Sequence, residues 1–256
     1  MEVGRSIAGV RPPAYRLPET IRLGRVRLQV ADLARSLAFY SGVLGFRATD
    51  TSQGRALLAA QDSADPIVEL VERRGANPVP RRGRIGLFHV AYLLPDRAHL
   101  ARFVRHVADE GVPVGMSDHL VSEAIYLSDP DGLGIEVYTD RPRDAWRVVN
   151  REIAMTTMPL NVPDLLRADE DGTWSGAPAG TQVGHVHLHV GDLNTGSAFY
   201  HDALGFDRVV WSYPGALFLS AGGYHHHLGT NVWAAGAAPA TKDDARLLEW
   251  RIVFPT

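Results

Sequence analysis

The sequence predicts an α+β fold of tandem βαβββ units, which form two cupped mixed sheets with the helices outside and with a fourth unit truncated. Three observations in the 256 residues predict it. One segment repeats at an offset of 160 residues, a fainter copy begins 64 residues after the first, and short strand patterns follow each predicted helix. Similarity at a fixed spacing within one chain is the signature of a repeated supersecondary unit.

The strongest repeat relates residues 24–46 to residues 184–206. The two segments read GRVRLQVADLARSLAFYSGVLGF and GHVHLHVGDLNTGSAFYHDALGF. Each begins with alternation of polar and apolar residues, which is typical of a half-buried strand. Asp32 and Asp192 then stand where a helix N-cap belongs, before an apolar-periodic stretch that closes with Leu-Gly-Phe. Each copy is therefore predicted to be a strand followed by a helix.

A fainter copy covers residues 88–112, which read FHVAYLLPDRAHLARFVRHVADEGV. It predicts a strand, a Pro-Asp turn and an amphipathic helix. The apolar face of that helix consists of Leu100, Phe103, Val104 and Val107. Residues 248–256, which read LEWRIVFPT, begin like a fourth copy. They place Glu249 where the third unit has His185.

Each of the three predicted helices is followed by two short strand patterns. They lie at 56–61 and 66–72, at 122–129 and 134–140, and at 216–222 and 227–234. Units one to four are therefore predicted at 24–72, 85–139, 184–234 and 245–256. A segment rich in Pro, Asp and Gly separates the halves, so we expect a first domain at 20–140, a linker at 141–182 and a second domain at 183–256.

The composition excludes several classes of function. Hydrophobic residues make up 45% and charged residues 21% of the chain, as in an ordinary soluble globular protein. A net charge of -3 offers no basic surplus, so nucleic acid and anionic membranes are not expected as partners. No apolar run approaches a membrane span or a signal peptide, which favours a cytoplasmic location. The absence of cysteine excludes disulfides, thiolate metal sites and a cysteine nucleophile.

Several motifs together resemble one family. Paired units that open like HVHLHVGDLNTGSAFY, at 185–200, resemble the vicinal oxygen chelate superfamily. Within it, GLFHVAYLLPDR, DHLVSEAIYLSDPDGLGIEVYTDRP and SAGGYHHHLGTNVW are similar to segments of the bacterial two-domain catechol 2,3-dioxygenases, and the similarity covers roughly residues 20–256. The resemblance implies a divalent metal inside a cupped sheet, Fe(II) with Mn(II) as the alternative ion. It also implies a catechol and dioxygen as substrates.

In this superfamily the metal ligands come from the first and last strands of the units. The matching positions hold His89 and Glu136 in unit two and His185 in unit three. Two neutral imidazoles and one carboxylate form the facial triad of non-haem Fe(II) oxygenases. Unit one has Arg25 at its first-strand position, and an arginine cannot lose its proton to become a ligand.

The placement of these ligands predicts how the units pair. Because units two and three carry the whole triad, we expect them to share one sheet and to leave unit one for the stub of unit four. The competing hypothesis is that units one and two pair conventionally and that the metal site is vestigial. An incompletely covered unit-one sheet would also recruit a second copy of the chain, so a homo-oligomer is expected.

Further residues match the family's catalytic positions. The resemblance assigns His226 as the acid/base, and His119 and Tyr126 as a pair that binds dioxygen or a catechol hydroxyl. His187, His225 and His227 are expected to contact the substrate, His187 because it shares a strand face with His185. Each residue also has a purely structural interpretation, as a histidine at a strand edge or in a surface loop, or as a tyrosine in a β-sheet core.

Extradiol cleavage of a catechol is therefore the function that the sequence favours. One alternative is a glyoxalase or thiol transferase of the same fold, whose sites favour more carboxylate and a Zn, Ni or Mn ion. The other is a metal-free protein that binds a planar ligand between Trp211, Tyr213 and Trp233. Membership of a fold family does not decide among these activities.

Overall fold

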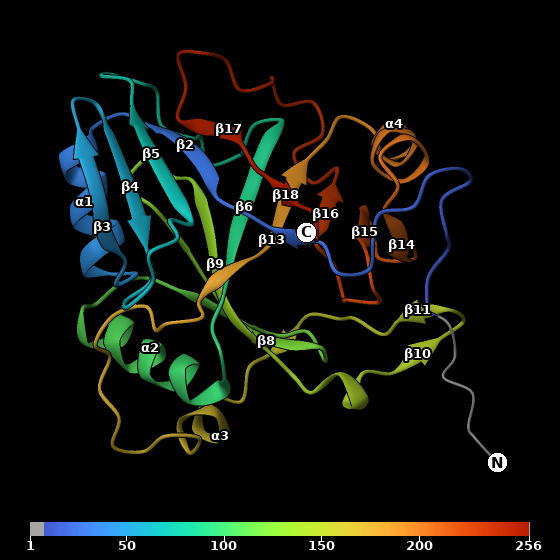
Figure 1. The fold of residues 1–256 in the computed structure, drawn as a ribbon, viewed down its shortest axis with the longest axis horizontal. Helices are drawn as coiled ribbons and strands as arrows, with labels where there is room; N and C mark the ends of the chain where they lie inside the picture. Colours follow the sequence, from blue (N-terminus) through green and yellow to red (C-terminus); the bar gives the residue numbers. More distant parts are fainter. Residues whose placement is uncertain (1–7, 256) are drawn as a thin grey trace.

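The computed structural model describes residues 8–255, and its helices and strands follow the predicted repeat (Figure 1). Unit one consists of β2 (Val26–Val30), α1 (Leu33–Gly42), β3 (Arg47–Ser52), β4 (Arg55–Ala59) and β5 (Val68–Glu72). The apolar half of the alternation in β2 is buried, and the side chain of Asp32 accepts a hydrogen bond from the backbone N–H of Arg35. The predicted N-cap therefore begins α1.

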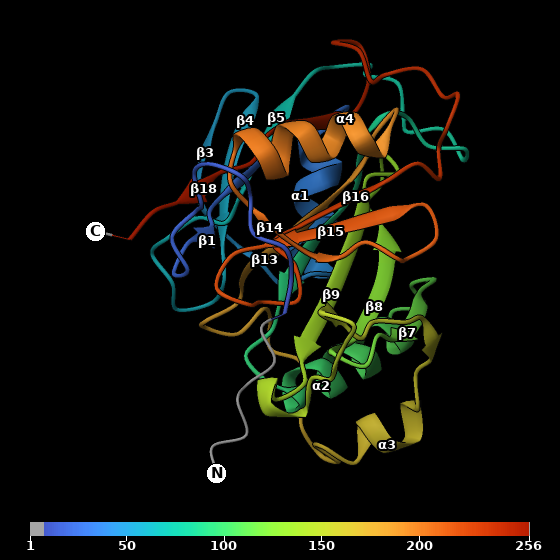
Figure 2. The same cartoon turned by 90° about the vertical axis from the view of Figure 1, so that its right-hand side faces the viewer.

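Unit two repeats this order at the predicted spacing. It consists of β6 (Gly86–Leu93), α2 (Arg97–Asp109), β7 (Gly115–Asp118), β8 (Ser122–Ser128) and β9 (Gly134–Asp140). Asp96 caps α2 by accepting a hydrogen bond from the backbone of His99. The four apolar residues predicted to form the inner face of this helix are all buried, and α2 packs against β9 (Figure 2).

Unit three has the same strand order but a different helix. It consists of β13 (Gln182–His189), α4 (Leu193–Ser197), a π-helical segment (Ala198–Ala203), β14 (Asp207–Val210), β15 (Ala216–Ser220) and β16 (Leu228–Asn231). Asp192 caps α4 by accepting from the backbone of Thr195. The wider π turn holds His201, whose Nδ1 lies 2.6 Å from the backbone oxygen of Phe206. Apolar periodicity did not predict this change of helix type.

The strand pairing joins units two and three in one sheet. In a nine-stranded sheet the order is β12-β7-β8-β9-β6-β13-β16-β15-β14, and the two units meet at the antiparallel pair β6 and β13. Within each unit the first strand runs parallel to the last, as β6 does with β9 and β13 with β16. The predicted pairing of units two and three is confirmed, and the conventional pairing of units one and two is not found.

Unit one pairs with unit four in the same way. The five-stranded sheet has the order β17-β2-β5-β4-β3, where β17 (Arg246–Glu249) runs antiparallel to β2. A second short strand, β18 (Ile252–Val253), pairs with β1 (Arg22–Leu23). The structure is thus a mixed α+β fold with two curved sheets, and α1, α2 and α4 lie at its periphery (Figure 1).

The segment between units two and three is more structured than a plain linker. It contains a 3-10 turn η1 (Arg143–Ala145), the hairpin strands β10 (Val148–Val149) and β11 (Glu152–Ile153), the edge strand β12 (Met158–Pro159) and the short helix α3 (Val162–Leu166). Both large sheets take strands from the two sides of this segment. The division into domains at 20–140 and 183–256 stays a prediction. Within residues 8–255, no helix is long and apolar enough to cross a membrane.

A buried carboxyl group joins units one and two and should make stability depend on pH. Asp129 accepts hydrogen bonds from the backbone N–H groups of Asp131 and Leu133, and the hydroxyl of Tyr40 lies 3.4 Å from its Oδ2. Burial, together with the nearby Asp131, raises the pKa of Asp129 to about 7. The folded chain therefore holds a proton that the unfolded chain releases near pH 4, and this group's contribution to stability falls as pH rises from about 4 to 7.

We expect Asp129→Asn to remove that part of the pH dependence, because an amide stays neutral while its oxygen still accepts both backbone N–H groups. Each pKa unit corresponds to roughly 1.4 kcal/mol, so the variant should gain stability relative to wild type between pH 5 and pH 8. Urea unfolding at the two pH values measures this, with the exposed Asp109→Asn as control. An identical loss of stability from pH 5 to pH 8 in wild type and Asp129→Asn would contradict it.

Candidate metal centre

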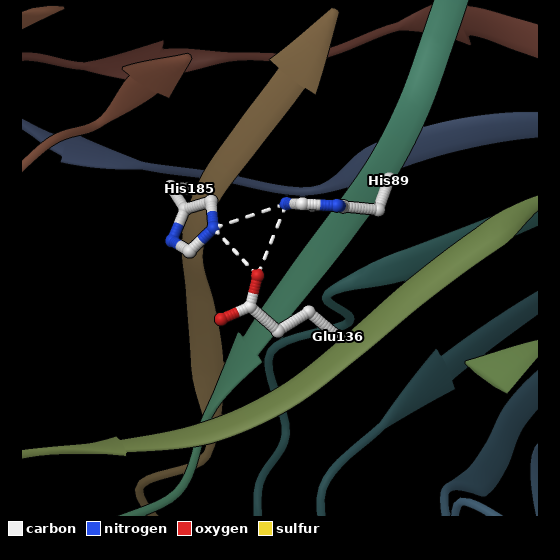
Figure 3. A group of neighbouring side chains, drawn as sticks. All are labelled: His89, Glu136 and His185. Carbon is white, nitrogen blue, oxygen red and sulfur yellow. Dashed lines mark hydrogen bonds and ion pairs between the residues drawn. The ribbon is translucent and has the colours of Figure 1, made fainter. Parts of the chain in front are cut away.

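Three neighbouring strands of the nine-stranded sheet bring the predicted ligands together. His89 lies on β6, Glu136 on the adjacent β9 and His185 on β13, on the other side of β6. Ala91 pairs with both Glu136 and His185, and His89 lies two residues along the same strand, so the register places all three side chains on one face of the sheet. Figure 3 shows them pointing toward a common centre.

The distances between the three donor atoms fit a metal ion. Nε2 of His89 and Nε2 of His185 lie 3.3 Å apart, and Oε2 of Glu136 lies 3.0 Å from the first and 3.1 Å from the second. Donors that sit at right angles around an ion, each about 2.1 Å from it, are about 3.0 Å apart. All three residues are buried, and among the described residues they are the one group of this kind that converges closely enough to hold an ion.

The charges of the cluster also favour a cation. Burial opposes ionisation, but His185 and His89 hold the pKa of the Glu136 carboxyl well below its ordinary value. Burial lowers the pKa of His185 to about 4, partly offset by Glu136, so its imidazole is neutral at pH 7. The Nε2 atoms of both imidazoles and the Glu136 carboxylate converge on one point, a donor set that suits a cation.

The equivalent positions in the other sheet hold an ion pair instead. Arg25 stands at the place of His89, Glu69 at that of Glu136 and Glu249 at that of His185. The guanidinium of Arg25 lies 3.0 Å from Glu69, which Arg55 also contacts at 2.8 Å. The positive charge that a metal would supply is already present there, so this sheet does not repeat the three-donor site.

A cavity of about 220 Å³ lies beside the three donors. The imidazoles of His187 and His226 border it near the cluster, and Ser117 and Ser122 contribute hydroxyl groups. Its other walls are mainly apolar and aromatic: Phe88, Met155, Tyr213, Phe218 and Trp233. Such a space suits a small planar ligand that reaches the donor cluster with its polar edge.

His119 and Tyr126 form a hydrogen-bonded pair in this cavity. Nδ1 of His119 lies 2.7 Å from the carbonyl oxygen of Thr156, and Nε2 lies 2.7 Å from the Tyr126 hydroxyl. A carbonyl only accepts, so Nδ1 carries the proton, and in a neutral ring Nε2 accepts from Tyr126. Tyr126 is the register partner of Glu136. Burial, with Glu136 adding to it, raises the pKa of the Tyr126 phenol well above its ordinary value.

The other predicted histidines fall into two groups. His187 and His226 line the cavity, and the ring centre of His226 lies 4.0 Å from that of His185. Gly229 makes room for the His187 ring, since a Cβ there would lie 2.8 Å from it. His225 lies behind His226, and His227 turns its Nδ1 toward Ser220. Neither His225 nor His227 belongs to the cavity wall, although both were predicted to contact substrate.

Several wall residues carried no sequence signal. Met155 and Thr157 come from the segment predicted as a linker, and Phe88 precedes a ligand on β6. The sequence predicts Tyr213 and Trp233 only as walls of a metal-free binding site, and Trp211 of the same set does not line the cavity. Apolar alternation marks such residues as buried but does not tell a core from a cavity wall.

Comparisons with known proteins place the chain in a family. The family model of the Glyoxalase/Bleomycin resistance protein/Dioxygenase superfamily matches residues 22–137 and 182–244. A catechol-2,3-dioxygenase of Bacillus subtilis (strain 168) is 43% identical over 241 residues, which cover 93% of this chain and 84% of the relative. A lactoylglutathione lyase of Salmonella typhimurium is 28% identical over 128 residues, 46% of this chain and 91% of that protein.

Among solved structures, a crystal structure of a proposed dioxygenase from Bacillus subtilis subsp. subtilis str. 168 has a TM-score of 0.60. It shares 16% identity with this chain and covers 92% of this chain and 70% of its own, so the likeness concerns the fold. The match of the family model to most of the chain and the 43% identical relative lead to one conclusion. The chain belongs to the Glyoxalase/Bleomycin resistance protein/Dioxygenase superfamily.

Proposed function

We propose that this chain is an Fe(II)-dependent extradiol dioxygenase that opens the ring of a catechol next to its two hydroxyl groups. The observation that carries the proposal is the convergence of His89, Glu136 and His185 at about 3 Å from one another beside a small aromatic-walled cavity. The similarity to a catechol-2,3-dioxygenase over 93% of the chain supports the choice of reaction.

His89, Glu136 and His185 would hold the ion through Nε2, Oε2 and Nε2. Fe(II) held there would bind a catechol and dioxygen and would supply a route for an electron between them. Mn(II) favours similar ligands and is the alternative ion.

The chain's own groups would then position the substrate and move its proton. The aromatic walls Phe88, Phe218 and Trp233 would confine the ring. His226 borders the cavity next to His185, and burial together with the neighbouring histidines keeps its pKa well below the ordinary value. A neutral His226 can accept a proton from a catechol hydroxyl and return it when the ring opens.

Tyr126 and His119 would orient the oxygen atoms of the substrates. The hydroxyl of Tyr126 lies at the cavity and keeps its proton, because burial and Glu136 raise its pKa. Its hydrogen bond to His119, which is itself fixed by the carbonyl of Thr156, holds the phenol in one direction. Because its one hydrogen is donated to His119, the phenol oxygen would accept a hydrogen bond from a catechol hydroxyl and so orient the ring.

Anaerobic loading with Fe(II), followed by catechol in aerated buffer, tests the proposal. We expect dioxygen uptake in a one-to-one ratio with catechol and a yellow product of the hydroxymuconic semialdehyde type. The same protein loaded with Ni(II) or Zn(II) and given the hemithioacetal of methylglyoxal and glutathione tests the glyoxalase alternative. Iron that binds but supports no dioxygen uptake with any catechol would contradict the proposal, and protein that binds no metal would favour the ligand-binding alternative.

Metal binding should also be visible without turnover. Because the ion would bind only the folded site, Fe(II) at a concentration 100-fold above its dissociation constant should stabilise the fold by about 2.7 kcal/mol. We expect the anaerobic melting temperature of the chelator-treated protein to rise with Fe(II) and to fall again with excess chelator. The His99→Ala variant, which loses a histidine outside the site, is the control and should show the same rise as wild type. A wild-type melting temperature that does not change when Fe(II) is added would argue against the metal centre.

A further inference from the structure

A chain of hydrogen bonds runs from His226, which borders the cavity, to His225 and Asp140, which do not line it. Nδ1 of His226 lies 2.7 Å from Nδ1 of His225, and Nε2 of His225 lies 2.9 Å from Oδ1 of Asp140. His225 is completely buried, His226 is 5% exposed, and the side chain of Asp140 is 25% exposed. Asp140 ends β9, the strand that also carries Glu136.

With a carboxylate at Asp140 and two neutral imidazoles, hydrogen-bonding capacity assigns each proton of the chain. An ionised Asp140 can only accept, so Nε2 of His225 must carry the hydrogen that it donates. In a neutral imidazole the other nitrogen then accepts, so Nδ1 of His225 receives a hydrogen bond from Nδ1–H of His226. Because Nδ1 of His226 is used in this way, Nε2 is the ring nitrogen left without a proton for the cavity.

The surrounding side chains hold this chain in place. The hydroxyl of Tyr224 donates to Oδ1 of Asp140 at 3.2 Å and lies 2.6 Å from the hydroxyl of Tyr138. The ring of His225 packs against Tyr224, with ring centres 4.2 Å apart, and against Trp146 at 5.4 Å. Burial against aromatic rings restricts rotation of the imidazole, so the geometry of the hydrogen bonds is preserved.

We propose that Asp140 and His225 are positioning residues that keep His226 in the tautomer whose Nε2 faces the cavity without a proton. The inference rests on the proposed function only for its catalytic consequence; the tautomer itself follows from the contacts. Unit two supplies the carboxylate and unit three supplies both histidines, so pairing of these units through β6 and β13 also assembles the proton acceptor. His225, which the sequence analysis expects to contact the substrate, lies behind His226 in this arrangement and would act through it.

The tautomer can be measured in metal-free protein. Long-range ¹H–¹⁵N spectra of protein labelled with ¹⁵N in its histidine side chains report which ring nitrogen is protonated, and the His226→Phe variant identifies the His226 signals. We expect Nδ1–H for His226 and Nε2–H for His225 in wild type. Asp140→Asn, whose amide can donate to His225, should shift both rings toward the opposite tautomers. The exposed Asp144→Asn serves as a matched control and should leave the spectra unchanged.

Kinetics of the Fe(II)-loaded protein test the consequence. Asp140→Asn should lower kcat by ~10- to 1000-fold and change KM for catechol by less than about threefold, because it alters the state of the base and not the cavity wall. Added to His226→Phe, the same substitution should cause no further loss, since the two residues act as a unit.

Several outcomes would overturn the inference. They are a wild-type His226 protonated at Nε2, spectra of His225 and His226 that do not respond to Asp140→Asn, and fully additive effects of the two substitutions on kcat. A wild-type protein that shows the expected tautomers but cleaves no catechol would instead support the hydrogen-bonded chain and remove the proposed function.

Discussion

The His185→Ala protein is expected to fold, to bind almost no iron and to cleave no catechol. The substitution removes one of three donor atoms that lie 3.0–3.3 Å apart and leaves a pair that cannot hold an ion facially. Even residues that only support metal ligands change metal affinity by ~10- to 100-fold when replaced, so loss of a ligand should exceed that range. Iron per chain after anaerobic loading and gel filtration measures the first effect, and dioxygen uptake measures the second.

The control for this experiment is His99→Ala, which removes an imidazole from the outer side of α2 and should keep both iron and activity. Circular dichroism separates loss of the metal from loss of the fold, since His185 also packs against Tyr138 and His226. A folded His185→Ala protein that retained one iron per chain would show that the ion binds elsewhere.

His226→Phe should lose activity without losing iron: we expect normal iron content and turnover reduced by roughly 10²–10⁴. Phenylalanine keeps an aromatic ring in contact with His185 and Phe218, whose ring centres lie 4.0 and 4.8 Å from that of His226. It removes the nitrogen that would accept the catechol proton, so kcat should fall much more than KM changes. Initial rates of dioxygen uptake over a range of catechol concentrations measure both constants.

The matched control is His106→Phe, the same replacement on α2, where the imidazole contacts the backbone of Gly42 away from the cavity. It should leave kcat within about twofold of wild type, as expected for a surface substitution. Wild-type turnover by His226→Phe would mean that another group moves the proton, and the phenol of Tyr126 would be the next candidate.

The sequence was sufficient for the fold and for the three donors. The repeat at offsets of 64 and 160 residues sets equivalent strands, and the period of two along each strand sets which residues share a face. His89 and His185 are on the first strands of units two and three, and Glu136 is on the last strand of unit two. The first strands of units one and four carry Arg25 and Glu249 at this position instead. The pairing of the units follows from this distribution, because a site is complete only where two units that carry donors meet.

The tertiary structure decided what surrounds the donors. Met155 and Thr157 line the cavity because the segment between units two and three folds back over the nine-stranded sheet, and no periodic pattern in that segment indicated it. The run Tyr224–His227 lies in the loop before β16, where alternation does not apply, so its side chains take directions set by their contacts. His226 faces the cavity, His227 turns to Ser220, and His225 turns to Asp140.

Sequence by itself thus determined the repeated strands and helices and the pairing of the units, through strand periodicity and repeat spacing, and the family resemblance pointed to the three residues that meet at the centre. Only the tertiary structure decided the cavity wall and the tautomer of His226. Both depend on contacts between segments that are distant in the sequence, such as Asp140 with His225, which are 85 positions apart, and hydrogen bonds of that kind leave no periodic trace in the sequence.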